Sequence, residues 1–205
     1  EIKELRLDAD SVSLALELFG VSDFAPVPYG VRVWKVRYIT QDRGQAVETT
    51  GLVSIPDVKD PLEVPVLLYL HPTMGFMDEC APTAIGLEGA AFPVLWASQG
   101  YIVVAPDYLG MHGWGEPADF LHPYVTAEPT AVASLDALRA MHHFTGESDV
   151  NITTDPARTV IWGASEGGFA ALWADRYAPY YAPEYGVSAV VAAVPPTDMM
   201  GLARE

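Results

Sequence analysis

The stretch "TVIWGASEGGFAAL", residues 159–172, constrains the fold of this chain more than any other. It passes from β-branched and aromatic residues, typical of a strand, through a glycine-rich cluster to small residues typical of a helix. Gly163 and Gly167 stand two residues before and two residues after Ser165. A sharp strand-to-helix turn requires glycine at such positions, because a side chain would collide there. Either the serine is incidental to this turn, or it is the nucleophile that a G-x-S-x-G turn presents to a substrate.

The elements around this turn decide between the two interpretations. Short, continuously apolar segments predict parallel strands that are buried on both faces, and they cover residues 64–72, 101–108, 159–165 and 187–196. The stretches between them that predict helices cover residues 90–100, 128–144 and 167–178. A strand therefore enters the turn and a helix leaves it, which is the context that a nucleophile requires. We predict that Ser165 is a nucleophile.

The first sixty residues have a different pattern. Residues 11–20 predict a short amphipathic helix that ends at Gly20. Residues 31–40 and 46–56 both predict strands, and the turn "QDRGQ" connects them. The chain is therefore expected to open with an antiparallel hairpin beside the parallel strands.

Composition excludes several classes of function. The chain has 205 residues, of which 50% are hydrophobic, so a single domain with a large core is expected. Its 27 acidic and 11 basic residues give a net charge of −16, which would repel nucleic acids. The apolar runs are shorter than the roughly 20 residues of a transmembrane helix. No cluster of potential ligands has the spacing of a metal site, so we expect neither a metal nor a cofactor.

Four stretches resemble the α/β-hydrolase fold, and more narrowly the secretory-lipase-like esterases and lipases. They are "HPTMGFMDECAP" (71–82), "APDYLGMHG" (105–113), "HPYVTAEPTAVASLDALRA" (122–140) and "GASEGG" (163–168). Together with the opening hairpin, the resemblance covers nearly the whole chain. It implies an α/β fold whose mostly parallel sheet carries an N-terminal antiparallel hairpin and has helices on both faces.

The resemblance also assigns roles to particular residues. Ser165 becomes the nucleophile that accepts the acyl group, within the elbow that Gly163 and Gly167 form. One donor of the oxyanion hole would be the backbone N–H of Glu166. The second would be Thr73 or Met74, and the choice stays open because "HPT" replaces the "HGG"-like or acidic residues of relatives.

The acid and the base of a catalytic triad are harder to place. In this fold they follow the serine in the order acid, then histidine, yet no histidine occurs among the 40 residues after Ser165. The five histidines that precede it are His71, His112, His122, His142 and His143. His71 and His122 precede prolines and are expected to position loops, whereas the pair at 142–143 falls in the last turn of a helix. Asp107 is expected to order its loop, and Asp198 is not favoured as the acid.

We therefore expect residues 1–205 to be the N-terminal part of a single α/β-hydrolase domain. By resemblance, residues 195–205 begin an inserted cap, and the C-terminal strands and the cap are absent from this chain. A C-terminal companion polypeptide of the same hydrolase would supply the acid and the histidine and would cover the exposed sheet edge. Cys80 is the only cysteine, so it is either a buried small apolar residue, which these 205 residues alone favour, or it pairs with a cysteine of another chain. The resemblance further implies that Cys80, in "CAP", bonds a later cysteine, which indicates a secreted or periplasmic location.

The predicted function is that of a serine carboxylic-ester hydrolase, an esterase or lipase, acting on a small-molecule ester or lipid through an acyl-enzyme. A serine peptidase of the prolyl-oligopeptidase type is the first alternative, although no propeller domain precedes residue 60. The second alternative is an inactive hydrolase scaffold that only binds. The intact serine elbow argues against it.

Overall fold

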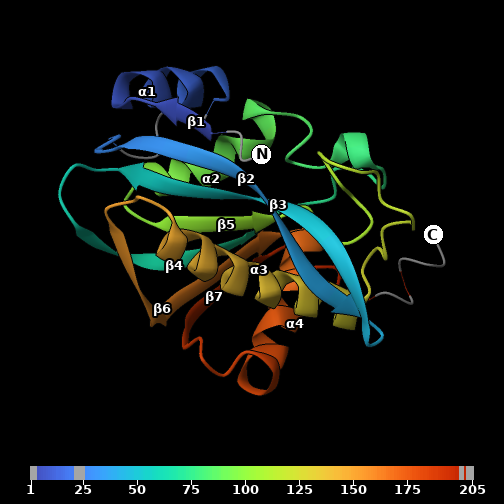
Figure 1. Ribbon diagram of the computed structural model, residues 1–205. Helices are drawn as coiled ribbons and strands as arrows, with labels where there is room; N and C mark the ends of the chain where they lie inside the picture. Colours follow the sequence, from blue (N-terminus) through green and yellow to red (C-terminus); the bar gives the residue numbers. More distant parts are fainter. Residues whose placement is uncertain (1–3, 21–25, 199–200, 202–205) are drawn as a thin grey trace.

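The computed structural model describes residues 4–20, 26–198 and 201, and it contains one mixed sheet with helices packed on both faces (Figure 1). The strands of the described chain are β1 (Glu4–Leu7), β2 (Gly30–Asp42), β3 (Gln45–Asp57), β4 (Leu62–Leu70), β5 (Ile102–Pro106), β6 (Ile152–Ala164) and β7 (Val187–Ala193). The helices are α1 (Ala9–Leu18), the 3-10 turn η2 (Asp78–Cys80), α2 (Leu87–Ser98), α3 (Ala127–Glu147) and α4 (Glu166–Tyr181).

The sheet combines an antiparallel part with a parallel part. Its strand order is β1-β2-β3-β5-β4-β6-β7, and the last four of these strands are parallel to one another. The expected hairpin is formed by β2 and β3, whose register runs from Gly30 opposite Asp57 to Asp42 opposite Gln45. Arg43 and Gly44, with φ of 50° and 75°, close it as the tight turn that matches the twist of the strands. The edge strand β1, antiparallel to β2, was not expected from the sequence.

Alternating side chains give the sheet two apolar faces. On β2, Val31 and Val33 pack in the core beneath α1 and α2, whereas Trp34, Val36 and Tyr38 pack in the core shared with α3 and α4. Figure 1 shows these two helical layers on opposite sides of the sheet. The expectation of helices on both faces is therefore confirmed.

The edge strand β7 is less well covered than the strands in the middle of the sheet. Among the described residues it pairs with β6 alone, and 44% of Val191 is exposed. Trp162 and Val160 of β6, which lie opposite Val191 and Ala189, are only half-buried. An apolar strip on the α2 side of the sheet is thus accessible at this edge.

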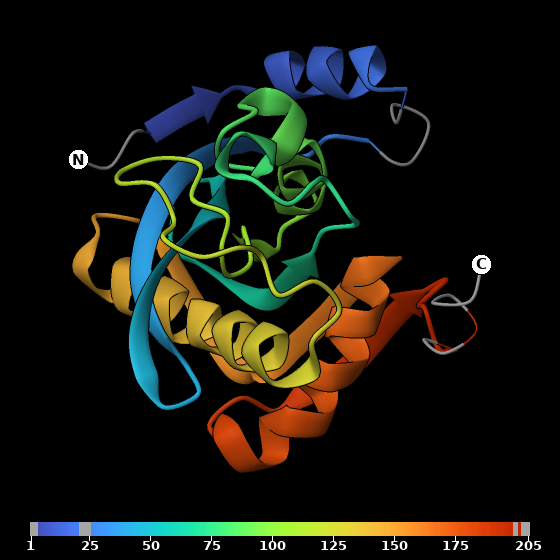
Figure 2. The same ribbon diagram turned by 90° about the vertical axis from the view of Figure 1, so that its right-hand side faces the viewer.

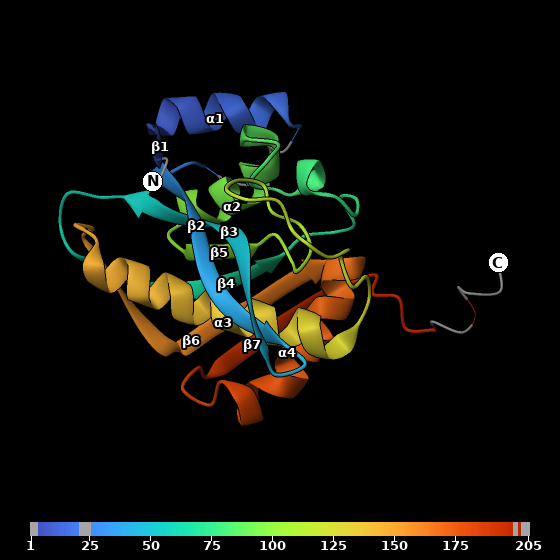
Figure 3. The same ribbon diagram turned by 45° about the vertical axis from the view of Figure 1, so that its right-hand side comes forward.

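The parallel strands bring three connections to one end of the sheet. Residues 71–86 follow β4, residues 107–126 follow β5, and α4 follows β6 directly. Figure 2 shows the loops of this end crossing in front of the sheet, and Figure 3 shows the described residues after β7 leading away from the body of the molecule on the same side. In the part of the chain that the structure describes, no helix has the length and apolar character needed to cross a membrane.

Candidate active site

Ser165 occupies the junction between β6 and α4 in a conformation that few residues adopt. Its φ is 55° and its ψ is −119°, outside the regions that ordinary side chains prefer. Its backbone N–H donates to the Ala193 carbonyl at 2.9 Å, and its carbonyl accepts from the Phe169 N–H at 3.1 Å. A strained backbone of this kind persists only where the surrounding structure holds it. Here β7 holds the serine from one side and the first turn of α4 from the other.

Two glycines allow three elements to meet behind the serine. A Cβ atom on Gly163 would lie 2.0 Å from the carbonyl oxygen of Gly167. A Cβ atom on Gly167 would lie 2.0 Å from the carbonyl oxygen of Leu70, the last residue of β4. No side chain fits at either position, so the start of α4 lies in backbone contact with the ends of both β6 and β4.

The backbone N–H groups predicted to form an oxyanion hole are located at this end of the sheet. Glu166 is the first residue of α4, so its N–H has no acceptor within the helix. Within the described residues, neither the Thr73 N–H nor the Met74 N–H donates a hydrogen bond to another part of the protein. Both follow His71, whose carbonyl oxygen would be 2.7 Å from a Cβ atom on Gly167. The two donor segments therefore begin at adjoining points of the backbone.

The side chain of Glu166 points inward and meets His122. These two side chains are 1% and 0% exposed, and His122 Nε2 lies 2.7 Å from Glu166 Oε1. His122 Nδ1 lies 2.8 Å from the carbonyl oxygen of Leu109. Because a carbonyl only accepts, Nδ1 carries the hydrogen of its bond to Leu109, and the second contact joins Nε2 to the carboxyl group. Both ring nitrogens of His122 thus have a partner within the protein.

A stack of rings continues from this pair toward the end of β4. Tyr108 lies between His122 and His71, with ring centroids 5.8 Å and 4.1 Å away. The Tyr108 hydroxyl donates to the His71 carbonyl at 2.9 Å. His71 Nδ1 donates to the Pro72 carbonyl at 2.7 Å, and burial lowers the pKa of the His71 imidazole, which keeps it neutral. His71 is therefore part of the support beneath the Thr73 loop.

Asp107 ties the loop after β5 to two other segments. Its carboxyl group accepts hydrogen bonds from the hydroxyl groups of Thr50 and Thr83 and from the Thr83 N–H. Burial raises the pKa of this carboxyl to about 6, although the hydrogen bonds oppose the shift. Its contacts are those of a residue that orders a loop.

The other candidates for an acid or a base either make hydrogen bonds with other parts of the protein or lie exposed on α3. His112 contacts two carbonyl oxygens, those of Glu116 at 3.0 Å and Glu48 at 2.8 Å. The helix that carries the pair at 142–143 continues to Glu147, so these exposed histidines precede its last turn rather than form it, contrary to expectation. Asp198 accepts from the Gly201 N–H at 2.8 Å. No described histidine makes a hydrogen bond with Ser165.

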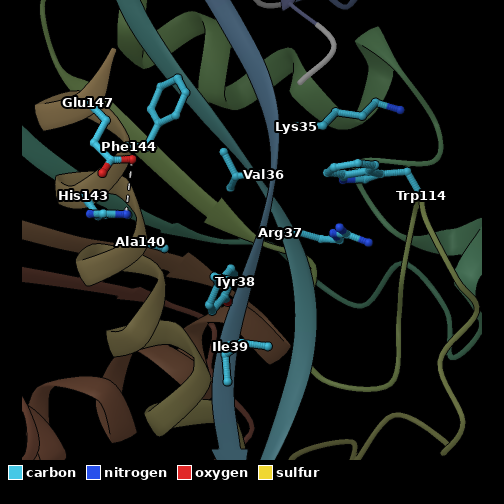
Figure 4. A pocket seen from close by; sticks show the side chains of 10 residues that line it. All are labelled: Lys35, Val36, Arg37, Tyr38, Ile39, Trp114, Ala140, His143, Phe144 and Glu147. Atoms are coloured by element: carbon cyan, nitrogen blue, oxygen red, sulfur yellow. Dashed lines mark ion pairs between the residues drawn. The ribbon is translucent and has the colours of Figure 1, made fainter. Parts of the chain in front are cut away.

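A groove between β2 and α3, of about 490 Å³, lies apart from these residues (Figure 4). Arg37 places its guanidinium 5.4 Å from the ring centre of Trp114 on one side of β2, and Phe144 of α3 faces the other side. None of the predicted site residues lines this groove. In the described part of the chain, no three histidine, cysteine or acidic side chains gather where a metal could bind.

Sequence reasoning missed two side chains of the site, those of Tyr108 and Tyr124. The hydroxyl of Tyr124 shares a hydrogen bond of 3.1 Å with the hydroxyl of Thr73. Both tyrosines stand in stretches that carry the family resemblance, "APDY" and "HPY", so the signal was present. Their partners are 37 and 51 residues away in the sequence, and only the structure reveals them.

Comparisons with known proteins identify similar chains. The family model described as "Secretory lipase" matches residues 84–205. Lipase 1 of Candida albicans is 34% identical over 176 residues, covering 78% of this chain and 34% of that protein. The trichothecene C-3 esterase of Fusarium sporotrichioides is 34% identical over 94 residues, covering 46% of this chain and 18% of the esterase. The chain thus spans about a third of the length of the first of these curated relatives and less than a fifth of the second.

Solved structures give the same fold over nearly all of the chain. A hydrolase of Legionella pneumophila superposes with a TM-score of 0.81 and 29% sequence identity. The match covers 96% of this chain and 52% of the Legionella chain. The rice cell wall degrading esterase LipA of Xanthomonas oryzae superposes with a TM-score of 0.79 and 24% identity, over 96% of this chain and 50% of its own. The architecture is that of the α/β-hydrolases, as expected.

Proposed function

The chain belongs to the secretory lipase family, and we propose that it is the part of a serine carboxylic-ester hydrolase that carries the nucleophile, Ser165. The observation that supports this most directly is the strained backbone of Ser165 at a strand-to-helix turn. At Gly163 and Gly167, on either side of the serine, the neighbouring backbone leaves no room for a side chain. A fold that needed only a turn would gain nothing from strain at a serine, because glycine adopts this φ without cost.

The reaction proceeds through an acyl-enzyme. Ser165 Oγ attacks the ester carbonyl carbon while a histidine removes its proton, and the carbonyl oxygen becomes an oxyanion. The backbone N–H groups of Glu166 and of Thr73 or Met74 stabilise that oxyanion, each contributing about 3 kcal/mol in comparable sites. The alcohol leaves with the proton of the histidine. Water then gives a proton to the histidine and attacks the acyl carbon. The acyl group leaves as a carboxylic acid, and Ser165 Oγ recovers its proton from the histidine.

The acid and the histidine come from outside residues 1–205. This is supported by the hydrogen-bond contacts of His71, His112 and His122, whose ring nitrogens bind other parts of the protein. These residues are the N-terminal part of the domain, and a C-terminal companion polypeptide packs along β7, where Val191 is exposed. The inserted cap begins at residue 195; of this segment, residues 199–200 and 202–205 lie outside the described residues.

The substrate is an ester or a lipid, and the protein is secreted or periplasmic. The names of relatives, lipases and an esterase, support the substrate class, and the family name supports secretion. Cys80 is free and partly exposed in the described chain. It is therefore accessible to a cysteine of the companion, and a disulfide between them requires an oxidising compartment.

Replacing Ser165 by alanine tests the proposal. The assay compares hydrolysis of 4-nitrophenyl esters by the complete enzyme and by Ser165→Ala, with circular dichroism as the control for folding. The expected result is a loss of turnover of at least a thousandfold with an unchanged spectrum. Turnover above a few per cent of the wild-type value would contradict the assignment of Ser165.

A further inference from the structure

A third segment connects the two segments that supply the proposed oxyanion donors. The segment is His122–Pro123–Tyr124, from the loop between β5 and α3. On one side, His122 Nε2 lies 2.7 Å from the carboxyl oxygen of Glu166. On the other side, the Tyr124 hydroxyl lies 3.1 Å from the Thr73 hydroxyl. The elbow and the loop after β4 are thus linked through the side chains of His122 and Tyr124, the two residues that flank Pro123.

Phe76 strengthens the second of these links. It follows Thr73 and Met74 in the loop after β4, and its ring meets that of Tyr124 edge-on at 5.1 Å. The same ring lies 6.4 Å from that of His122 at an interplanar angle of 29°. The β4 loop therefore contacts both ring-bearing residues of the segment, so its position depends on more than a single hydrogen bond.

The segment is itself fixed to the end of β5. His122 Nδ1 donates to the Leu109 carbonyl at 2.8 Å, and the Tyr124 N–H donates to the His122 carbonyl at 2.9 Å. Gly110, with φ of 78°, lies so close to the segment that a Cβ atom on it would be 2.4 Å from the backbone nitrogen of His122. Because the segment is held in this way, it fixes the position of Glu166 relative to that of Thr73.

We propose that His122 and Tyr124 are positioning residues that hold Glu166 and Thr73, and with them the two sides of the oxyanion hole, at a fixed separation. This inference rests on the proposed function of Ser165. An oxyanion is stabilised when its donors lie about 2.7–3.1 Å from it, and a misplacement of about 1 Å can cost up to a hundredfold in rate. The links therefore act on the transition state and leave binding of the substrate in its ground state largely unaffected.

Substitutions of Glu166 separate the role of its hydrogen bond with His122 from any role of its carboxyl group as an acid or a base. In Glu166→Gln, the side-chain amide can still form a hydrogen bond with His122 Nε2, while Nδ1 still donates to the Leu109 carbonyl. The link is kept and the ionisable group is removed. In Glu166→Leu, the volume is retained and the link is lost. A positioning role thus predicts that the glutamine variant loses much less turnover than the leucine variant.

The experiment uses variants of the complete enzyme, with all the polypeptide that the native preparation contains. Tyr124→Phe and Thr73→Val remove the hydroxyl groups of the second link, singly and together. Tyr180→Phe, at a tyrosine of α4 that is 88% exposed, is the matched control. The measurements are kcat, KM, the thermal midpoint and inhibition by a trifluoromethyl ketone, which forms a tetrahedral adduct with the serine.

Positioning predicts a distinct set of results. Tyr124→Phe and Thr73→Val each lower kcat by about three- to tenfold with KM unchanged, and the double variant is no slower than the slower single variant. Affinity for the trifluoromethyl ketone falls by the same factor, whereas Tyr180→Phe changes neither quantity. Glu166→Gln retains at least a third of the wild-type kcat, while Glu166→Leu loses at least tenfold.

Unchanged kcat in Tyr124→Phe, or equal losses in Glu166→Gln and Glu166→Leu, would overturn the inference. So would losses explained by unfolding alone, with a lower thermal midpoint and unchanged inhibitor affinity. Fluorophosphonate labelling of Ser165 in the same preparations separates this outcome from a failure of the proposed function. If labelling is intact and kcat does not depend on the links, only the positioning role is wrong.

Discussion

The α-carbon of Gly167 faces the carbonyl oxygen of Leu70 so closely that an added Cβ atom would be 2.0 Å away. This contact joins the start of α4 to the end of β4, the strand that leads into the Thr73 loop. The turn that carries the nucleophile and the strand that leads to the proposed oxyanion loop are therefore in direct backbone contact. Backbone atoms cannot move aside as a flexible side chain can.

Gly167→Ala is accordingly expected to lower turnover by more than tenfold and to destabilise the fold by a few kcal/mol, because the backbone must separate to admit a methyl group. Gly146→Ala is the control, since a Cβ atom at that position in α3 meets nothing within 4 Å. Thermal unfolding and ester hydrolysis measure the two effects. A Gly167→Ala enzyme as stable and as active as the Gly146→Ala enzyme would refute the geometry.

The buried carboxyl group of Asp107 predicts a dependence of stability on pH. Burial raises its pKa to about 6, above the value of about 3.9 in unfolded chains, so the folded state holds this proton more tightly. The stability that the protonated group contributes is complete below about pH 4 and is lost as the pH rises through about 6. Relative to Asp107→Asn, the wild type should lose up to about 3 kcal/mol over this range and level off above it.

Urea unfolding at several pH values between 4 and 7 measures that difference. His71, whose pKa is lowered by burial, titrates in both proteins and cancels from the comparison. Asp175→Asn, an exposed change of equal charge on α4, is the control. A constant difference between wild type and Asp107→Asn throughout the range would show that Asp107 stays ionised in the fold.

The proposed origin of the catalytic histidine predicts that these 205 residues alone do not hydrolyse esters. The isolated chain, purified under denaturing conditions to a single species and refolded, should show no turnover above that of the Ser165→Ala enzyme. Adding the companion should restore activity. Ester hydrolysis by the isolated chain through Ser165 would place the base within it and would make the assignment of the histidines wrong.

Cys80 predicts a covalent link in the native preparation. Electrophoresis should resolve one larger species without reductant and two polypeptides with it, and Cys80→Ser should separate them under both conditions. Sequencing of the second band should then find an aspartate or glutamate followed by a histidine. Identical mobility with and without reductant would exclude a disulfide between two chains.

The sequence predicted the fold in outline because its signals are local. The apolar runs located the parallel strands, and the turn "QDRGQ" located the hairpin. The edge strand β1, residues Glu4–Leu7, was missed because four residues of alternating polarity carry little signal until β2 is beside them. The start of β6 at Ile152 was placed seven residues too late, since Asp155 and Pro156 interrupt its apolar pattern.

The site was predictable where it depends on a local backbone requirement and not where it depends on distant partners. The glycine spacing around Ser165 indicated the turn directly. The inward course of the Glu166 side chain depends on His122, 44 residues earlier, and no short pattern connects them. His122 was expected to position a loop, and the structure adds the partner, a buried carboxyl group at the elbow.

The most direct test of the account is the site of covalent modification by a fluorophosphonate, which reacts with an activated serine. The complete enzyme is treated with the probe, digested and mapped by mass spectrometry, with Ser165→Ala treated in parallel. We expect one adduct, on the peptide that contains Ser165, and none in the variant. An adduct on another serine, or no adduct in an enzyme that hydrolyses esters, would contradict it.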